Sequence, residues 1–533
     1  MKIFTFFILF IVCLSGYAQH WEWARKANAT TAGQIPRKVC GDNLGNVFLL
    51  GNNEKKATYG NTVLDSGSFI VKYDSIGNIQ WAKNIEGTPK GIDCDAFGNL
   101  YVVGNFMGNI SVGSYYITSN GDYDFYLIKM NPSGNELWVK SYGGVLTDWS
   151  NAVQIDKKGN AYLTGHFWGD SINFGSYTLK DTTPAGHFYL VKINSIGTVQ
   201  WASEGLSNDS TGDYWTGMLI RTDKKENIYV IARGSTCNSQ NCSGELLARF
   251  DSLGNLTFSN FKWSSYEDVE GLAIDDSLNI FALYFFTNQY GGYGTLSKYN
   301  ASMNQSWSHY LGNGYEGYSF GAGLSIDSAG NIFTAGNIGN DWNSSSDSIL
   351  FDSNWIPLKG QTDVAVIKIN SSGSLMWIKT AGGNKAEFAY DMCVNQFGDC
   401  FVAGLFNWHY SGIQNDTVIV GIDTLINDGN WGQSFVAKLE QSNINTSVQT
   451  LINNDNIFII YPNPTSGIFT VNLHNCQAGA KVIVRDVLGN CFLERNCRSE
   501  SSQEINLSCQ PRGIYFVELL SGDERVVRKV TVQ

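Results

Sequence analysis

The sequence is poor in charged residues and has no cluster of positive ones. Charged side chains make up 16% of the 533 residues, and 48 acidic residues outnumber 36 basic ones, which gives a net charge of −12. Proteins that bind nucleic acid or anionic membrane surfaces gather Lys and Arg side chains into patches. The chain shows no such run in sequence, so nucleic acid is not expected among its partners.

Metal-binding spacings and membrane-spanning runs are also missing. The six histidines, at positions 20, 166, 187, 309, 409 and 474, are scattered. No cysteine spacing resembles the paired CxxC of a zinc site. After the first 20 residues, no apolar run approaches the length that a transmembrane helix needs. We therefore expect neither a metal centre nor a transmembrane segment.

Glycine and aromatic residues are abundant instead. The chain has 57 Gly, 30 Phe, 26 Tyr and 15 Trp. This composition, with little charge, favours short strands joined by tight turns over helices. The chain begins MKIFTFFILFIVCLSGYAQ, where one Lys, an apolar run and small residues have the layout of a secretory signal peptide. We expect residues 1–18 to be removed after Ala18 and the protein to be exported, with a membrane anchor as the alternative.

An exported protein can form disulfides, and ten cysteines remain after Cys13. Cys237 and Cys242 bracket the loop CNSQNC and form one candidate pair. Cys393 and Cys400 flank a predicted hairpin turn, across which they could face each other, and form the second. Four more cysteines lie near the C-terminus, where three pairings are possible. Reduced, buried cysteines are the alternative for all of them.

One short pattern, Asp-x-x-Gly-Asn followed by an apolar run, recurs along the chain. The copies begin at Asp42, Asp95, Asp156, Asp223, Asp275, Asp327 and Asn395. Intervals of roughly 50 to 70 residues are typical of solenoids and propellers. A second strand-turn-strand unit follows each copy, such as FYLVKINSIGTVQWAS from Phe188. One repeat is therefore a four-stranded antiparallel meander, with strands A to D and a Trp in most D strands.

The seventh copy lacks its D strand, and the N-terminus offers a matching one. The stretch HWEWARKA aligns Trp23 with the D-strand tryptophans at positions 81, 138, 201, 307 and 377. A β-propeller closes in this way, because a last blade shared by both ends of the domain removes the exposed sheet edges. We therefore expect residues 19–440 to form an all-β, seven-bladed β-propeller whose last blade the N-terminal strand completes.

The repeats resemble the bacterial β-propeller repeat family often labelled SBBP. Units of that family end in a Lys-apolar-x-x-x-Gly-x-x-x-Trp pattern, as LVKINSIGTVQW does here. The resemblance covers most of the chain before the C-terminal segment. It implies the propeller fold and fixes no activity.

A polar linker, residues 441–456, leads to a C-terminal segment, residues 457–533. In the segment, YPNPTSG places two prolines, Asn463 and Gly467 just before an alternating strand. This arrangement predicts a rigid turn that enters a small β-sandwich.

The C-terminal segment resembles the type A C-terminal sorting domain of the type IX secretion system. The matching residues are Tyr461, Pro462, Asn463, Pro464, Gly467, Phe469, Gly513, Tyr515, Val517, Lys529 and Val530. Such domains carry cargo across the outer membrane and are usually removed by a sortase-like peptidase. The resemblance implies the secretion machinery and this peptidase as partners, and a product that is secreted or attached to the outer cell surface.

No catalytic site is expected. The stretches GYSFG and GNGYEG, within residues 312–321, satisfy a nucleophile elbow and a dinucleotide fingerprint, but no helix follows them and both motifs require a strand-turn-helix context. The Asp-x-x-Gly-Asn turns could offer oxygens to calcium. An Asp that caps its own turn and a Gly with positive φ explain the same spacing without an ion. No cofactor is expected, and calcium is the open alternative.

Loop length separates the two ends of the repeats. The A–B and C–D turns are short and repetitive, whereas the B–C and D–A connections are long and varied. Seven tryptophans fall in the long connections: Trp149, Trp168, Trp215, Trp342, Trp355, Trp408 and Trp431. Loops on a rigid scaffold gather binding residues, and aromatic side chains suit sugar rings or protein partners.

We therefore expect a non-catalytic protein that binds a glycan or protein partner at this face. One alternative is a polysaccharide-active hydrolase or lyase that uses paired carboxylates in the propeller funnel. Another is a structural or adhesive surface component. For each Trp, packing inside a loop core is the further alternative.

Overall fold

The computed structural model describes most of the chain. The described residues are 20–26, 33–180, 186–205, 214–235, 243–264, 267–288, 291–311, 318–319, 322–339, 348–351, 354–395, 398–406, 416–427, 432–440, 458–473, 481–486, 491–496, 502–508, 510–521 and 524–532. The predicted signal peptide, the linker and most of residues 312–321 lie outside them. The chain divides into two units, Met1–Asn443 and Ile444–Gln533. Within the described ranges both units consist of strands and turns without a helix, which confirms the predicted all-β class.

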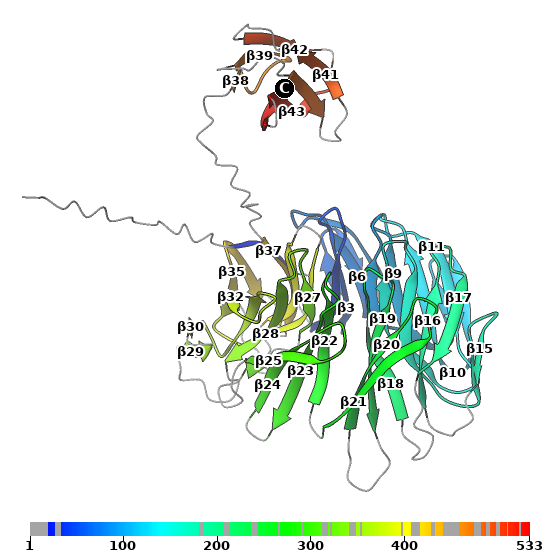
Figure 1. The fold of residues 1–533 in the computed structure, drawn as a ribbon. Helices are drawn as coiled ribbons and strands as arrows, with labels where there is room; N and C mark the ends of the chain where they lie inside the picture. Colours follow the sequence, from blue (N-terminus) through cyan, green and yellow to red (C-terminus); the bar gives the residue numbers. More distant parts are fainter. Residues whose placement is uncertain are drawn as a thin grey trace, which may run out of the picture. The chain divides into compact units, whose positions relative to one another are not determined.

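In the described part of the first unit, strands in chain order form seven antiparallel sheets, here called sheets 1 to 7, whose strands are called A to D (Figure 1). Sheet 1 contains β2 (Gln34–Gly41), β3 (Val47–Asn53), β6 (Gly67–Tyr73) and β7 (Ile79–Asn84). Sheet 2 contains β8 (Thr88–Cys94), β9 (Leu100–Val112), β10 (Tyr115–Met130) and β11 (Glu136–Tyr142). Sheet 3 contains β12 (Asp148–Ile155), β13 (Ala161–Phe167), β16 (His187–Ile193) and β17 (Val199–Glu204). Sheet 4 contains β18 (Tyr214–Thr222), β19 (Ile228–Ser235), β20 (Ser243–Phe250) and β21 (Leu256–Ser264). Sheet 5 contains β22 (Glu267–Ile274), β23 (Ile280–Asn288), β24 (Gly291–Tyr299) and β25 (Gln305–Leu311).

Sheets 6 and 7 depart from the simple order. In sheet 6 two short strands, β26 (Tyr318–Ser319) and β27 (Leu324–Ile326), share the first position, ahead of β28 (Ile332–Gly339), β31 (Thr362–Ile369) and β32 (Leu375–Gly383). Beyond β32 the sheet continues into a hairpin of β35 (Asp416–Val420) and β36 (Asp423–Asn427). Sheet 7 contains β33 (Glu387–Val394), β34 (Cys400–Phe406), β37 (Gln433–Glu440) and β1 (His20–Lys26). Strand β1 pairs antiparallel with β37, with Ala24 opposite Ala437. The two ends of the first unit therefore meet in one sheet.

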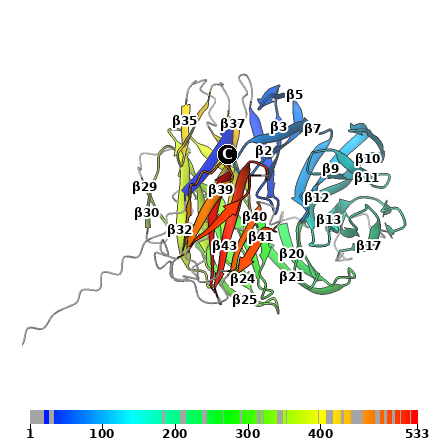
Figure 2. The ribbon, with the colours of Figure 1, turned by 90° about the horizontal axis from the view of Figure 1, so that it is seen from above.

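The sheets surround a common axis, with their A strands innermost (Figure 2). The A strands contact one another in the order β2, β8, β12, β18, β22, β27, β33 and again β2. Apolar clusters fill the spaces between neighbouring sheets: Trp23, Phe401 and Val436 of sheet 7 pack with Val47 and Phe69 of sheet 1. Each sheet therefore buries both faces only because it has a neighbour on each side.

The recurring turn has a local cause. In the first copy, Asp42 Oδ1 accepts hydrogen bonds from Leu44 N at 2.8 Å and Asn46 N at 2.9 Å, and Asp42 Oδ2 accepts one from Asn46 Nδ2 at 2.7 Å. Gly45 has φ 80°, which a residue with a Cβ rarely adopts. The carboxylate is thus occupied by its own turn, and these contacts account for the spacing of the pattern.

The recurring Lys and Trp of the second units in sheets 1 and 2 clamp neighbouring sheets together. Lys72 Nζ and Trp81 Nε1 of sheet 1 both donate to the carbonyl oxygen of Pro132 in the C–D turn of sheet 2, each at 3.0 Å. We call this arrangement the Lys–Trp clamp. At the seam, Trp23 of β1 and Lys438 of β37 donate to Ser75 O, at 3.0 and 3.5 Å. The seam therefore uses the same clamp as sheets 1 and 2.

Several B–C connections contain a hairpin, which the sequence analysis missed. The hairpins are β4 (Ala57–Tyr59) with β5 (Thr62–Leu64), β14 (Ser171–Asn173) with β15 (Thr178–Lys180), β29 (Ser348–Phe351) with β30 (Asn354–Pro357), and β35 (Asp416–Val420) with β36 (Asp423–Asn427). β5 contacts β7 and β15 contacts β17, the outer strand of the same sheet in each case. These two hairpins therefore fold back against the outer edge of their own sheets.

The second unit is a pair of small sheets. One holds β38 (Phe458–Tyr461), β39 (Ile468–Leu473) and β42 (Ser502–Asn506), and the other holds β41 (Cys491–Asn496), β40 (Lys481–Asp486), β43 (Gly513–Ser521) and β44 (Glu524–Val532). Phe469 and Val471 of the first sheet share one core with Val484 and Val517 of the second. The shared core holds the two sheets face to face.

Candidate functional site

The predicted tryptophan face is only partly described by the structure. Trp342, Trp408 and Trp431 lie outside the described residues, and for Trp355 only the strand β30 is described. The other three, Trp149, Trp168 and Trp215, lie at the end of their sheets where A strands begin and B strands end.

The structure corrects the placement of two of these tryptophans. Trp149 and Trp215 lie inside the A strands β12 and β18 and not in loops, because each strand begins earlier than its apolar pattern indicates. Trp215 is 2% exposed and packs in the core. Trp168, by contrast, is 37% exposed. Of the three, Trp149 and Trp168 therefore remain accessible, and Trp215 does not.

A β-bulge interrupts most A strands at the same place, five residues before the recurring turn. The bulged residues are Arg37, Lys90, Asn151, Met218, Glu270 and Tyr390. A bulge leaves one residue out of the ladder and re-aims its side chain, and bulges are frequent beside functional sites. Six of the seven repeats thus present a different side chain from a common position near the axis.

Three bulged residues converge on one cavity of about 500 Å³ between sheets 1 and 2, here called the mouth cavity. Arg37 comes from sheet 1, Lys90 from sheet 2 and Tyr390 from sheet 7, and Lys38 adds a third cation. The remaining lining residues are Leu50, Gly51, Asn52, Gly67, Ser68, Gly87, Thr88 and Pro89, so the lining contains no carboxylate.

The cations of the mouth cavity perturb one another. Burial lowers the pKa of Lys90, and the nearby Arg37 lowers it further. Lys90 Nζ lies 5.5 Å from the centre of the Trp149 ring, a cation–π contact. Lys38 Nζ lies 3.4 Å from Asp391 Oδ1, whereas Arg37 and Lys90 form no ion pair with any residue that the structure describes. Uncompensated positive charge is therefore concentrated at this cavity.

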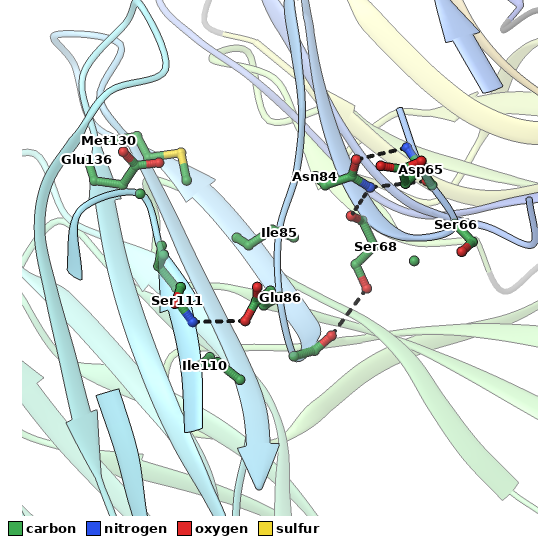
Figure 3. Close-up of a pocket in the computed structure, with 14 residues that line it drawn as sticks. Asp65, Ser66, Ser68, Asn84, Ile85, Glu86, Ile110, Ser111, Met130 and Glu136 are labelled. Atoms are coloured by element: carbon green, nitrogen blue, oxygen red, sulfur yellow. Dashed lines mark hydrogen bonds between the residues drawn. The ribbon is translucent and has the colours of Figure 1, made fainter. Parts of the chain in front are cut away.

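A second cavity of about 510 Å³ adjoins the first and shares Gly67, Ser68 and Gly87 with it. Figure 3 shows its lining, in which Asp65, Glu86 and Glu136 contribute carboxylates. All three are engaged: Lys56 Nζ lies 2.9 Å from Asp65 Oδ1, Ser111 N donates to Glu86 Oε2 at 2.8 Å, and Lys83 Nζ donates to Glu136 Oε1 at 2.7 Å. Together the two cavities form a groove that is cationic at its inner end and acidic at its outer end.

Carboxylates nearer the axis tie the A strands together. Asp93 Oδ2 of sheet 2 accepts hydrogen bonds from Ile155 N at 2.7 Å and Gln154 Nε2 at 3.0 Å, both in sheet 3. Asp391 Oδ2 of sheet 7 accepts one from Val39 N of sheet 1 at 2.8 Å. Burial raises the pKa of Asp93 to about 6. These acids bind neighbouring strands, so their positions have a structural cause.

The predicted disulfide between Cys393 and Cys400 is wrong, because both cysteines are free. In the ladder, Cys393 lies opposite Phe401, and Cys400 lies opposite Val394. A shift of one residue in a strand reverses the face on which a side chain lies. The two thiols therefore enter different cores, Cys400 between sheets 6 and 7 and Cys393 between sheets 7 and 1. Cys237 and Cys242 lie outside the described residues.

In the second unit, Asn463 joins the YPNP turn to the last strand. Its Oδ1 accepts a hydrogen bond from Thr531 N at 2.9 Å, and its Nδ2 donates one to Lys529 O at 2.8 Å. Phe469 is buried in the core, and the Tyr515 hydroxyl donates to Pro511 O at 2.7 Å. Gly467 has φ 115°, and a Cβ there would lie 2.7 Å from Ser508 Cα.

Val517 and Val530 are buried in the same core, and five other motif residues face solvent. Tyr461 is 47% exposed, and Pro462, Pro464, Gly513 and Lys529 are exposed as well. Residues 459–533 match the family model of the secretion system C-terminal sorting domain. The tail is a secretion system C-terminal sorting domain. The sorting domain directs export through the type IX secretion system, to the cell surface or out of the cell. It presents these exposed residues around a turn that Asn463 holds in place.

The chain is distantly similar to several other proteins. An uncharacterized WD repeat-containing protein of Acanthamoeba polyphaga mimivirus is 23% identical over 199 residues, which are 31% of this chain and 14% of that protein's length. A puromycin hydrolase structure covers 83% of this chain and 59% of its own, with 9% identity and a TM-score of 0.41. The polysaccharide lyase Uly1 covers 80% and 93%, with 8% identity and a TM-score of 0.39. Likenesses at this level carry no argument about activity.

The described residues contain neither a membrane-spanning helix nor a metal-binding group. They include no helix long and apolar enough to cross a membrane. Within the same ranges, no group of three or more His, Cys, Asp or Glu side chains could hold a metal ion. The mouth cavity, which the sequence analysis missed, remains the strongest candidate site of the described part. The sequence feature that could have revealed this cavity is the fixed offset of five residues between each bulged residue and the recurring turn.

Proposed function

We propose that the protein is an exported, non-catalytic binding protein, secreted or attached to the cell surface. Its first unit acts as a seven-bladed β-propeller in which β1 completes the last blade, and its sorting domain is removed by a sortase-like peptidase during export. The pairing of β1 with β37 and the closed order of A-strand contacts support this architecture.

The observation that carries the binding function is the convergence of bulged residues at the mouth cavity. Arg37, Lys90 and Tyr390 come from three different sheets, and their cationic and aromatic side chains line one concave site. Binding pockets of about 300–1,000 Å³ with a few placed polar groups are typical ligand sites. The scaffold contacts around them, in turns, clamps and cores, have structural causes of their own. Arg37 and Lys90 form no ion pair with any residue that the structure describes, so a glycan or protein ligand is the function that they support.

The test is a glycan array probed with the full chain and its variants. Lys90→Ala and Tyr390→Ala should reduce binding to whichever glycans the protein retains. Lys157→Ala and Lys224→Ala remove exposed charges from short A–B turns at the opposite end of the sheets and should leave binding unchanged. If the turn variants lose binding while Lys90→Ala and Tyr390→Ala bind normally, the site lies at the opposite end of the sheets and the proposal is wrong.

The second candidate function is a polysaccharide hydrolase or lyase. It is favoured by the carboxyl groups near the axis, where burial raises the pKa of Asp93 and Asp391. Against it, both groups bond to the backbone of a neighbouring strand. Incubating the full chain with each bound glycan and measuring its chain length decides between the two: a shortened glycan indicates the enzyme, and an unchanged one indicates the binding protein.

A further inference from the structure

We infer that the mouth cavity binds the anionic group, a carboxylate or a sulfate ester, of an acidic polysaccharide. The inference rests on the proposed binding function and specifies its ligand. Three observations carry it: the charge of the lining, the polar and aromatic groups beside that charge, and the reversal of charge along the groove.

The charge of the lining is unusual for this chain. Arg37, Lys38 and Lys90 line one cavity without a carboxylate, although acidic residues outnumber basic ones in the sequence. Lys38 approaches Asp391, but Arg37 and Lys90 have no ion-pair partner in the described part of the chain. Two close cations without a counterion repel each other, and a bound anion would relieve that repulsion.

The groups beside the cations fit a sugar. A guanidinium and an ammonium can both donate to a carboxylate or sulfate, in charge-assisted hydrogen bonds. Asn52, Thr88 and Tyr390 add polar groups to the same lining, and the Tyr390 side chain is 36% exposed. Next to Lys90, the Trp149 ring lies 6.0 Å from that of Tyr123, which is 37% exposed. Exposed aromatic area next to charge-assisted donors suits a charged sugar ring.

The groove favours a polysaccharide over an acidic peptide. Its outer end carries Asp65 and Glu136, which are paired with Lys56 and Lys83, and Glu86, which has no ion-pair partner in the described part of the chain. Glu86 repels further negative charge, and all three carboxylates can accept hydrogen bonds from hydroxyl groups. A peptide rich in Asp and Glu would place negative charge at both ends of the groove. A glycan can place one anionic group on the cations and lay neutral, hydroxyl-bearing sugars along the acidic end.

The test measures binding of the full chain to polymers that differ in charge alone. Polygalacturonate is compared with its fully methyl-esterified form, and dextran sulfate with dextran. Titration calorimetry at low salt should give tight binding of at least one anionic polymer and at least about 10-fold weaker binding of its neutral counterpart. Binding should weaken as salt increases, because screening reduces the attraction. Binding of polygalacturonate would indicate recognition of a carboxylate, and binding of dextran sulfate would indicate recognition of a sulfate ester.

Variants connect the binding to the cavity. Arg37→Gln and Lys90→Gln should each weaken binding of the anionic polymer by about 10-fold, the loss of one charge-assisted hydrogen bond. Lys157→Gln and Lys224→Gln each remove one positive charge from the short A–B turns and should change the affinity for the anionic polymer by less than about 2-fold. Unchanged melting temperatures show that the variants fold. Equal losses in both pairs of variants would mean that general charge, and not this cavity, attracts the polymer.

Three further outcomes overturn the inference. Equal binding of neutral and anionic polymers, with sensitivity to Lys90→Gln, refutes the anionic group but leaves the proposed binding function intact. Poly-L-glutamate binding as tightly as the acidic polysaccharide, with the same sensitivity, assigns the site to an acidic protein segment. Absence of binding to all four polysaccharides refutes the acidic-polysaccharide ligand, and the glycan array then tests the broader function separately.

Discussion

Asp124 and Asp148 are two carboxyl groups with no exposed surface, close to the start of β12. Each keeps its Oδ1 atom without a hydrogen-bond partner in the described part of the chain. Burial raises the pKa of Asp148 to about 7, with a smaller contribution from Asp124, whose own pKa burial raises to about 6. Gly143 makes room for Asp124, since a Cβ there would collide with Asp124 Cγ. At neutral pH these residues therefore reduce the stability of the fold.

Replacing Asp148 with Asn should weaken the dependence of stability on pH. The unfolded carboxyl group loses its proton near pH 4 and the folded one near pH 7, so the folded state holds an extra proton in this window. Stability then falls as pH rises, by about 1.4 kcal/mol per pH unit for one such group. Asn stays neutral, so Asp148→Asn should gain free energy of unfolding relative to the wild type between pH 5 and pH 7.5.

Urea titrations of both proteins at the two pH values measure this difference. His166, whose pKa burial lowers to about 4, titrates in both proteins and cancels in the comparison. An identical free-energy difference between variant and wild type at pH 5 and pH 7.5 would show that Asp148 ionises normally in the fold.

At the scale of elements, deletion of β1 tests the seam. Removing residues 20–27 takes away Trp21 and Trp23, which are 4% and 3% exposed, together with the clamp to Ser75 O. Loss of one buried Trp side chain costs about 3–5 kcal/mol, so the deletion should lower the midpoint of thermal unfolding by several degrees or more. The control is removal of residues 445–452 from the linker. Matching midpoints for the two deletions would refute the composite blade.

Strands and turns were largely predictable from sequence, because their causes are local. The Asp-x-x-Gly-Asn pattern marks a turn wherever Asp caps it, and alternation marks the strands on both sides. The sorting domain was predictable for a similar reason, since its motifs carry fixed geometry such as the Asn463 hydrogen bonds to the last strand. Both of these expectations, the all-β class and the C-terminal sorting domain, are confirmed.

The mouth cavity could not be predicted, because its members come from separate repeats. Arg37, Lys90 and Tyr390 share an offset from their turns but differ in chemistry, so no motif connects them. Only the closed order of sheets brings sheet 7 beside sheet 1 and places Tyr390 near Arg37. The Cys393–Cys400 prediction was wrong for a related reason, since it depended on a register that sequence leaves open by one residue.

At the scale of the whole molecule, the first unit should fold without the sorting domain. The chain divides at Asn443, and the linker carries none of the repeat residues. Residues 19–445, expressed alone, should be soluble and melt in one cooperative transition, because each sheet finds its neighbours within this range. Calorimetry and solubility measurements check this result. An insoluble fragment beside a soluble full chain would show that the sorting domain is integral to the fold.

The Lys–Trp clamp at the seam also sets an order in time. Trp23 and Lys438 donate to the same carbonyl of Ser75, which lies 52 positions from the first and 363 from the second. A chain that is synthesised from its N-terminus exposes the Trp first and the Lys almost last. Contacts between such distant positions form slowly, because a long loop must close before they add any stability. We therefore expect closure of the ring to be the last step of folding, with the edge of the early sheets uncovered until residue 438 has been synthesised.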